Sequence, residues 1–533
     1  MHLRRIVSRA SIALCAFVPP LLVASSAQAF CGFYVAPSDA PLYADATMVA
    51  LMREGTRTAL SMSNNYKGPA ADFAMVVPVP VVLQKEDVKT LSHDVFSRLE
   101  SLSAPRLVEY WEQDPCYEPP VEDPGVMYDK AGAAPMATAS AGANGYGVTI
   151  EAKFAVGEYD VVVLGAKESD GLERWLTDNG YKIPKGAAAA LAPYVEQQQK
   201  FFVAKVDIKK VKLDDKGVAV LSPLRFHYES ADFRLPVRLG LLNSSGKQDL
   251  IVYVLSKNDR YQVANYKNAF IPTNLDVTDA TRASFGAFYA ALFDATLDKA
   301  SGRAVITEYS WMSNGCDPCP TPPLGDPDIA ALGGDALLGM PPPPGAADAG
   351  SGVNGDPTGG YYGSSTPMVL TRLHTRYSAS TLTDDLVFQA APAVVGGREM
   401  PRAGEEGKDG ALETGATPAS QNNFQARYAI RHPWTGAITC GKPHRGVWGG
   451  PPSGEEAKPV AATGLAAQPR DGVQLASMIV SNAAELDLKK DAPPAGVAPP
   501  VVPLPFPWSR VAIAVSLVAA LFAAAVFFTR KRA

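Results

Sequence analysis

The feature that most restricts how this chain can fold is an alternation between strand-like segments and long stretches with too few large apolar residues for a core. Residues 117–145, 320–366 and 396–420 are rich in small, Pro or acidic residues and show no hydrophobic periodicity. Strand-like patterns nevertheless resume afterwards, as in "MVLTRLHTRY" and "NNFQARYAIRH". We therefore predict one discontinuous domain whose last strands return after disordered insertions.

The ordered segments favour an α+β fold that is rich in strands and has a few helices. Alternating or continuous apolar runs predict strands, and apolar residues spaced three or four apart predict helices. "RLPVRLGLLN" and "DLIVYVLSK" are predicted to pair as a hairpin through the turn at 244–247. The other main predictions are strands in 47–66, 72–82, 148–169, 200–211 and 221–230, and helical spacing in 85–113 (interrupted by Pro105), 171–181 and 187–199.

The N-terminus is typical of a secretory signal peptide. Three arginines precede an apolar stretch that is too short and too rich in proline to span a bilayer, and Ala27-Gln28-Ala29 is a small-x-small cleavage site. Lipidation of Cys31 is the alternative, but bulky Phe30 separates that cysteine from the cleavage site. We expect an exported protein.

The C-terminus predicts a single membrane-spanning helix. Residues 511–528 carry no charge and are just long enough to cross a thin bilayer. Arg530, Lys531 and Arg532 follow, and the positive-inside rule places them in the cytoplasm and the preceding domain outside. A sorting tail that is later removed has the same appearance, so a permanent anchor and a temporary one both stay open.

These features predict a linear layout of signal peptide, discontinuous exterior domain, stalk, membrane helix and cytoplasmic tail. The stalk is inferred from Pro- and Ala-rich text such as "APPAGVAPPVVPLPFP", which favours an extended, semi-rigid chain. In order, the predicted segments are 1–29, 30–449 (with its three insertions), 450–509, 510–529 and 530–533.

The charge balance argues against a nucleic-acid partner. Without the signal arginines and the basic residues around the membrane helix, 42 basic residues face 54 acidic ones, a net charge of −12. Nucleic-acid binding needs a basic surface, so an acidic exterior excludes that class. The expected partners are the membrane, through the C-terminal helix, and another envelope protein or surface component.

Five cysteines follow the signal peptide, and an exported location permits disulfides between them. The candidates are Cys31, Cys116, Cys316, Cys319 and Cys440. Because five is an odd number, at least one thiol is unpaired or bonded to another molecule. A bridge between Cys31 and Cys116 would close the first ordered block, and Cys440 could join Cys316 or Cys319 across the insertion.

Cys316-Asp-Pro-Cys319 has three interpretations. A redox site of thioredoxin type needs a helix directly after the pair, but "PTPPLGDPD" follows. A zinc site could combine the pair with Cys440 and His444, with His374 and His432 in the same returning segments, although this pattern is weaker than two CxxC motifs. A structural disulfide is the favoured reading, either within the pair or to Cys440.

The sequence indicates no catalytic, cofactor-binding or metal-binding residue. HExxH and GxSxG motifs are absent, and the histidines stand alone. Asp384 and Asp385 are adjacent carboxylates that would point to opposite faces of a strand, which favours a solvated turn.

Several segments resemble an exported bacterial family known as domain of unknown function 2330. They are "CGFYVA", "DFAMVVPVP", "SAPRLVEYWEQDPC", "CDPCP", "LTRLHTRY…LTDDLVF" and "NNFQARYAIRHPW", which occur in this order over roughly residues 31–440. The resemblance implies a cell-envelope protein that is led by a signal peptide and often tethered to the membrane. It implies no activity.

The function predicted from the sequence is therefore a membrane-tethered envelope protein without enzymatic activity, which serves binding, adhesion or scaffolding. One alternative is an exported, hydrolase-like enzyme whose site is assembled from scattered residues. The other is an envelope protein that binds a metal or handles thiols through Cys316 and Cys319.

Overall fold

The computed structural model describes twelve stretches of the chain, and the predicted signal peptide, Cys31, insertion 117–145, membrane helix and cytoplasmic tail lie outside them. The chain divides into two units, Met1–Leu488 and Lys489–Ala533, and the second unit also lies outside the described residues. No helix in the described part is long and apolar enough to cross a membrane. The described residues are 33–35, 43–44, 47–63, 66–67, 73–116, 148–213, 219–243, 246–343, 364–399, 412–454, 457–481 and 486.

The largest sheet is built around strand β16 (Gln248–Ser256), all nine residues of which are buried. This strand pairs in parallel with β3 (Thr47–Glu54) and antiparallel with β21 (Val369–Tyr377). Its side chains alternate between two hydrophobic clusters, with Val252 facing one and Tyr253 the other, as the two-residue period of a strand requires. The other strands of this sheet are β4 (Arg57–Ser63), β7 (Val88–Thr90), β14 (Leu224–Glu229), β18 (Lys267–Phe270), β20 (Ala304–Met312), β23 (Val394–Gly396), β24 (Thr417–Pro418) and β25 (Asn423–Gln425).

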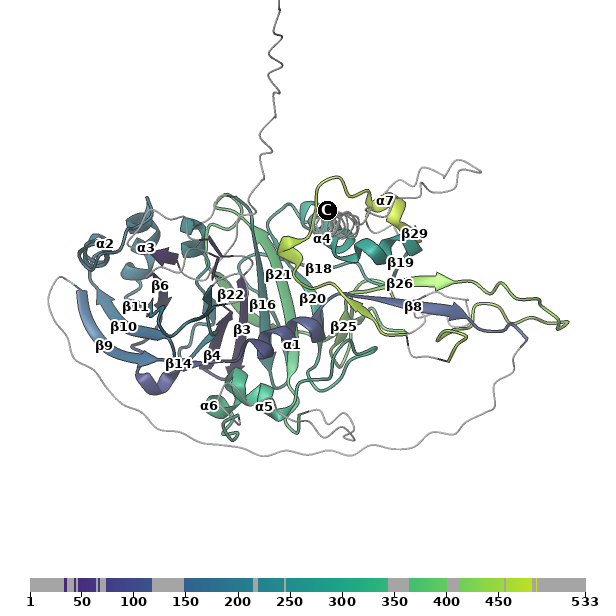
Figure 1. Cartoon of the computed structure of the whole chain (residues 1–533), viewed down its shortest axis with the longest axis horizontal. Coiled ribbons are helices and arrows are strands. Elements are labelled where there is room, and N and C mark those ends of the chain that lie inside the picture. Colours follow the sequence, from purple (N-terminus) through teal and green to yellow (C-terminus); the bar gives the residue numbers. More distant parts are fainter. Residues whose placement is uncertain are drawn as a thin grey trace, which may run out of the picture. The chain divides into compact units, whose positions relative to one another are not determined.

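A second, antiparallel sheet packs against one face of the large sheet (Figure 1). Met75 and Val77 of its strand β6 (Ala74–Val79) enter the cluster shared with β16, whereas Val76 faces helices α2 (Ser169–Asp178) and α3 (Ala187–Glu196). The apolar core therefore lies between the two sheets, and the helices cover the outer face. The other strands here are β1 (Phe33–Val35), β9 (Val148–Val156), β10 (Tyr159–Ala166) and β11 (Lys200–Val206).

A third sheet packs on helix α4 (Phe285–Lys299), which is buried along most of its length. Strand β26 (Arg427–His432) lies between β8 (Arg106–Glu112) and β19 (Leu275–Val277), both in parallel (Figure 1). Phe288 of α4 contacts Tyr428 edge-on, with ring centroids 5.5 Å apart. The remaining strands here are β27 (Trp448–Gly449), β28 (Val460–Ala461) and β29 (Ile479–Ser481).

Short elements complete the described part. Two of its sheets have two strands each, and a third has three. The strands are β2 (Tyr43–Ala44), β5 (Tyr66–Lys67), β12 (Lys212–Leu213), β13 (Ala219–Val220), β15 (Arg234–Leu235), β17 (Arg260–Val263) and β22 (Leu386–Ala391), and the helical elements are η1 (Lys85–Asp87), α1 (His93–Ser103), η2 (Arg238–Asn243), η3 (Asp279–Ser284), α5 (Asp326–Ile329), η4 (Ala330–Gly334), α6 (Asp335–Leu337), η5 (Leu465–Ala467) and α7 (Leu475–Met478).

The predicted strand-rich α+β fold with few helices is confirmed in the described part. The returning segments also take central positions: β21 lies between β16 and β20, and β26 lies between β8 and β19. A central strand supplies hydrogen bonds to a neighbour on each side, so these late segments are integral to the two sheets.

Two local predictions are wrong. Residues 238–243 form the 3₁₀ helix η2, and β16 pairs with β3 and β21 in place of the predicted hairpin partner. Helical spacing in 85–113 yields one α-helix, α1, which begins after the N-cap Ser92, while Val88 belongs to strand β7. In both cases long-range pairing with buried strands outweighs the local pattern.

Two predicted boundaries are also wrong. Leu324, Ile329 and Leu332 of the supposed insertion 320–366 are buried in the cluster on the α1 face of the large sheet. The first part of the supposed stalk folds as well, because Leu465 and Ile479 are buried against α4 and the third sheet. The few apolar residues in these Pro- and Gly-rich segments are sufficient because they fill gaps in a core built by other strands.

Neighbouring residues of β29 test whether residues 457–481 belong to the folded unit. Ile479 is 3% exposed and Val480 is 51% exposed. We expect Ile479→Ala to lower the free energy of unfolding by about 2–5 kcal/mol, because it leaves a cavity in the core. The control Val480→Ala should change it by less than about 0.5 kcal/mol. Equal effects in urea titrations would mean that this segment does not pack on the domain.

Candidate ligand-binding cleft and buried charge network

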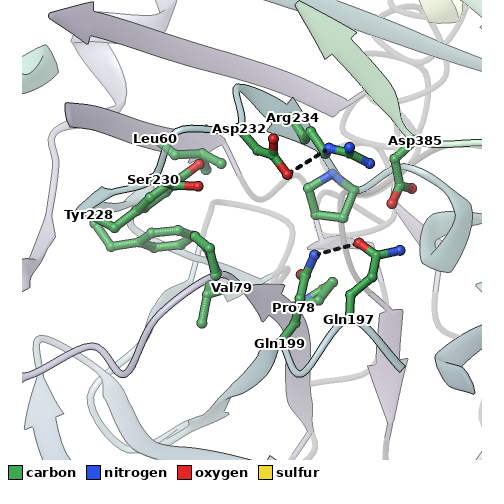
Figure 2. A pocket seen from close by; sticks show the side chains of 13 residues that line it. Leu60, Pro78, Val79, Gln197, Gln199, Tyr228, Ser230, Asp232, Arg234 and Asp385 are labelled. Atoms are coloured by element: carbon green, nitrogen blue, oxygen red, sulfur yellow. Dashed lines mark hydrogen bonds and ion pairs between the residues drawn. The ribbon is translucent and has the colours of Figure 1, made fainter. Parts of the chain in front are cut away.

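A surface cleft of about 470 Å³ opens where β4 and β14 of the large sheet approach the end of β6 (Figure 2). This volume lies in the range of sites for small ligands. Its apolar lining is Leu60, Pro78, Val79, Pro80, Phe226, Tyr228 and Pro236. Its polar lining is Gln197, Gln199, Ser230, Asp232, Arg234 and Asp385.

The ends of helices and strands, and the segments that connect them, position the polar groups of the cleft. Gln197 is the C-cap of α3, and Gln199 directly precedes β11. Ser230 and Asp232 lie in the connection from β14 to β15, and Arg234 begins β15. Strands and helices thus hold the backbone on both sides of these side chains, while the side chains themselves reach solvent, which is where binding groups concentrate.

The polar side chains form two weak pairs that a ligand can exchange for its own groups (Figure 2). Asp232 and Arg234 are 3.3 Å apart, and their side chains are 69% and 44% exposed. An ion pair this exposed contributes little to stability, so both charges stay available. The Gln199 amide donates to the Gln197 side-chain oxygen at 3.3 Å.

Asp385 fixes one wall of the cleft. It accepts hydrogen bonds from the Tyr194 hydroxyl at 2.7 Å and from the Val237 amide at 3.0 Å, and it pairs with Arg238. Burial and the neighbouring Asp385 carboxylate raise the pKa of Tyr194 well above its ordinary value. The expectation of a solvated turn therefore holds only for exposed Asp384, because Asp385 links α3 to β22.

A second cluster lies in the interior, where the fully buried Glu308 of β20 holds three partners. Its carboxylate is 2.6 Å from the Arg372 Nε, 2.7 Å from the His374 Nδ1, and accepts from the Tyr289 hydroxyl at 2.6 Å. These contacts tie β20 to β21 and to α4. A buried carboxylate with this many partners is compensated for the water it has lost.

The cluster continues from His374 towards the surface. His374 Nε2 is 3.1 Å from Asp249 of β16, and Arg470 contacts both Asp249 at 2.9 Å and Asp294 of α4 at 2.6 Å. Arg376 also pairs with Asp294, at 2.7 Å. The chain of charges therefore connects strands β16, β20 and β21 of the large sheet with α4 and the C-terminal segment.

The sequence suggested that His374 is an isolated residue, but in the structure it belongs to this cluster. Both of its ring nitrogens face carboxylates, and Phe293 stacks on the ring at a centroid distance of 3.8 Å. Sequence reasoning missed this cluster, although Arg372, His374 and Arg376 alternate along β21 and so share one face. Because His374 is fully buried and stacked, substrate has no access to it, and the cluster is structural.

Electrostatics hold this cluster in its charged form. Burial would raise the pKa of Glu308, but His374 and Arg372 outweigh it and lower the pKa to about 2. Burial likewise opposes the charge of His374, but Glu308 and Asp249 raise its pKa above the ordinary value. The imidazolium then donates from both nitrogens.

Two disulfides lie in the described part of the chain. Cys116 bonds to Cys440, with Cα atoms 5.5 Å apart, and Cys316 bonds to Cys319, with Cα atoms 5.0 Å apart. Neither the Cys31–Cys116 bridge nor a bridge from Cys440 to the CDPC pair is formed. The tertiary structure explains this pairing. Strand β26 lies parallel to β8, so the residues after β26, which include Cys440, lie close to the residues after β8, which include Cys116.

The disulfides differ in what they hold. Cys116–Cys440 closes a loop with a sequence separation of 324 residues, which corresponds to about 6 kcal/mol of chain entropy removed from the unfolded state. Cys316–Cys319 spans a separation of 3 residues, which corresponds to about 2 kcal/mol. Cys116–Cys440 is therefore the disulfide that contributes more to the stability of the domain.

The candidate zinc ligands are not brought together. Cys440 and the CDPC cysteines belong to different disulfides, and His432 pairs with Glu109 at 2.9 Å and stacks on Trp111. His374 lies in the buried cluster, and His444 is exposed. The described residues contain no group of three or more His, Cys, Asp or Glu side chains that could hold a metal ion.

Together, these features define a strand-rich α+β domain with one long-range disulfide and a polar surface cleft. The chain belongs to the bacterial family of domain of unknown function 2330, described as an uncharacterized protein conserved in bacteria, which matches residues 25–389. The resemblance seen in the sequence is confirmed up to residue 389, and the segment 422–434 lies beyond the match. No curated protein and no solved structure matches the chain.

The buried cluster predicts a stability maximum at mildly acidic pH. The raised pKa of His374 means that its contribution is complete below about pH 6.5 and is lost as the pH rises through the folded-state value. The lowered pKa of Glu308 means that its contribution is present above about pH 4.5 and is lost as the pH falls towards 2. Thermal unfolding measured from pH 3 to 9 should show both limbs.

His374→Gln should lower the free energy of unfolding by about 3–5 kcal/mol near pH 6, because it breaks a buried charge pair, and should remove most of the alkaline limb. The control His444→Gln changes an exposed histidine and should leave the whole profile unchanged. If the alkaline limb persists in His374→Gln, another group produces it.

The two disulfides can be compared by paired serine substitutions. Cys116→Ser with Cys440→Ser should lower the free energy of unfolding in urea by about 2–5 kcal/mol, because the unfolded chain regains its freedom. Cys316→Ser with Cys319→Ser should cost about 2 kcal/mol or less, because its loop is short. A larger loss of free energy of unfolding in the Cys316→Ser, Cys319→Ser protein would mean that this disulfide is the more stabilising one.

Proposed function

We propose that this chain is an exported, membrane-tethered binding protein of the cell envelope, and that its cleft takes a short peptide segment of a partner. The observation that carries the proposal is the lining of the cleft, where two amides and one exposed pair of opposite charges stand beside an apolar and aromatic surface. Export and tethering are supported by the signal-like N-terminus and the apolar C-terminal segment of the sequence.

The chemistry of a peptide matches this lining group by group. The Gln197 and Gln199 amides can each donate to a peptide carbonyl and accept from a peptide N–H. Arg234 suits a carboxylate, and Asp232 suits an ammonium or guanidinium group. The apolar surface formed by residues such as Val79 and Phe226 can receive an apolar side chain.

The described lining favours binding over hydrolysis. Ser230 is the hydroxyl residue at the rim, and no histidine is among the described residues that line the cleft with it. Asp385 already accepts from Tyr194 and Val237, so it is committed to holding the wall. A serine without a histidine beside it and a carboxylate already held by Tyr194, Val237 and Arg238 give little basis for nucleophilic catalysis.

Two disulfides are consistent with export, since disulfides persist in oxidising compartments and are rare in the cytosol. The long-range bridge holds the β8 and β26 region together, so a domain exposed to the exterior keeps its fold through a covalent bond as well as through its core.

Binding can be tested with a library of defined tetrapeptides and the purified protein, followed by isothermal titration calorimetry on those that bind. We expect Arg234→Ala to weaken the affinity by about tenfold or more, which corresponds to about 1.4 kcal/mol, and Gln199→Ala to weaken it less. The matched control Arg174→Ala removes an exposed arginine of α2 outside the cleft and should leave the affinity unchanged.

Two outcomes would contradict the proposal. Peptide binding that is equally affected by Arg174→Ala would place the site elsewhere. Binding of neutral oligosaccharides in the same assay without any peptide binding would assign the cleft to another ligand class.

A further inference from the structure

The Cys316–Cys319 disulfide differs from a structural bridge in its position. It connects residues within a single loop after β20 and holds no distant elements together. Cys319 is exposed, whereas Cys316 is half-buried and packs against the cluster on the α1 face of the large sheet. An incoming thiolate can therefore reach Cys319 more readily than Cys316, and exposed disulfides are the labile ones in proteins.

Buried side chains hold the backbone of this loop. The Arg106 Nη1 donates to the Pro318 carbonyl at 2.8 Å, and the Gln425 amide donates to the Asp317 carbonyl at 2.6 Å. Both side chains are fully buried and come from strands of the folded core. The loop therefore keeps its shape independently of the disulfide, which favours re-formation of the bond after reduction.

Arg106 also places a positive charge against the backbone between the two cysteines, at the Pro318 carbonyl. Its guanidinium is fully buried, bonds to the carbonyls of Leu102, Ala104 and Pro318, and has no ion-pair partner among the described residues. Its Nε has no hydrogen-bond partner there either. Burial, together with the nearby charges of Arg427 and Arg372, lowers the pKa of Arg106 to about 10, so it stays charged at neutral pH.

We propose that Cys316–Cys319 is a redox-active pair that exchanges electrons with a dithiol, and that the positive charge of Arg106 stabilises its thiolate form. A cationic neighbour lowers the pKa of a thiol, as the start of a helix does in other CxxC sites. This replaces the helix that the sequence lacks after Cys319, since α5 begins only at Asp326. The proposal does not depend on the cleft or on its ligand.

The exchange balances in two steps. One thiolate of the dithiol attacks the Cys319 Sγ, the bond to Cys316 breaks, and Cys316 leaves as a thiolate. The second thiolate of the dithiol then attacks the dithiol sulfur that is bonded to Cys319. This forms a disulfide within the dithiol and releases Cys319 as a thiolate. Two electrons pass to the Cys316–Cys319 pair, the dithiol becomes a disulfide, and its two protons go to the new thiolates or to solvent.

The first test equilibrates the purified full-length chain with dithiothreitol and its oxidised form at a series of ratios, then alkylates free thiols and identifies each site by mass spectrometry. We expect Cys316–Cys319 to open and close reversibly at ratios where Cys116–Cys440 stays oxidised and the circular dichroism signal is unchanged. If both disulfides open together, or only when the domain unfolds, the proposal is wrong.

The second test compares single cysteines. With oxidised glutathione, Cys316→Ser should form a mixed disulfide at Cys319 at least about tenfold faster than Cys319→Ser forms one at Cys316. In Cys316→Ser, the alkylation rate of Cys319 should have a pH midpoint below the ordinary thiol value of about 8.5.

Charge variants made on Cys316→Ser separate thiolate stabilisation from exposure alone. Asp317→Asn removes the carboxylate beside the pair and should lower the midpoint further, whereas Arg106→Met should raise it. The exposed Asp317 variant keeps the test informative if Arg106→Met fails to fold. A midpoint at or above 8.5 that does not respond to Asp317→Asn would overturn the role of charge, and equal reactivity of both cysteines would overturn the exchange mechanism.

Discussion

The carboxylate of Glu308 is the interaction on which the arrangement of this domain depends most. It is buried in the large sheet, is neutralised by Arg372 and His374 of the neighbouring strand, and accepts a hydrogen bond from the Tyr289 hydroxyl of α4. Through His374 and Asp249 the same set of contacts reaches Arg470 in the C-terminal segment. Because a buried charge without its partners is costly, strand order, helix position and the return of the chain are all specified together.

This interior cluster and the surface cleft have opposite properties. Glu308, His374 and Asp249 of the cluster are buried and bonded to charged partners inside the protein, so they determine which elements can lie together. Asp232 and Arg234 in the cleft are exposed and pair with each other among the described residues, so both can meet a ligand. The CDPC pair is intermediate, since the backbone of its loop is held by buried Arg106 and Gln425 while Cys319 faces solvent.

Much of the strand content could be predicted, but little of its pairing. The strands predicted in 47–66 are present as the antiparallel pair β3 and β4. Nothing near β16 in the sequence indicates that its neighbours come from residues 47–52 and 369–377, because buried strands have similar apolar patterns and pairing is decided across the chain. The cleft was not predictable for the same reason, since Gln199, Arg234 and Asp385 come from three separate segments.

The sequence by itself determined the strand-rich composition, the discontinuous order of the segments, the family and the features of both ends that predict export and tethering. These features depend on patterns among residues that are close together in the sequence. The tertiary structure decided that Cys116 bonds to Cys440, that His374 lies between two carboxylates, and that residues 457–481 pack on the core. Each of these depends on the distance between residues far apart along the chain, which only the pairing of the sheets establishes.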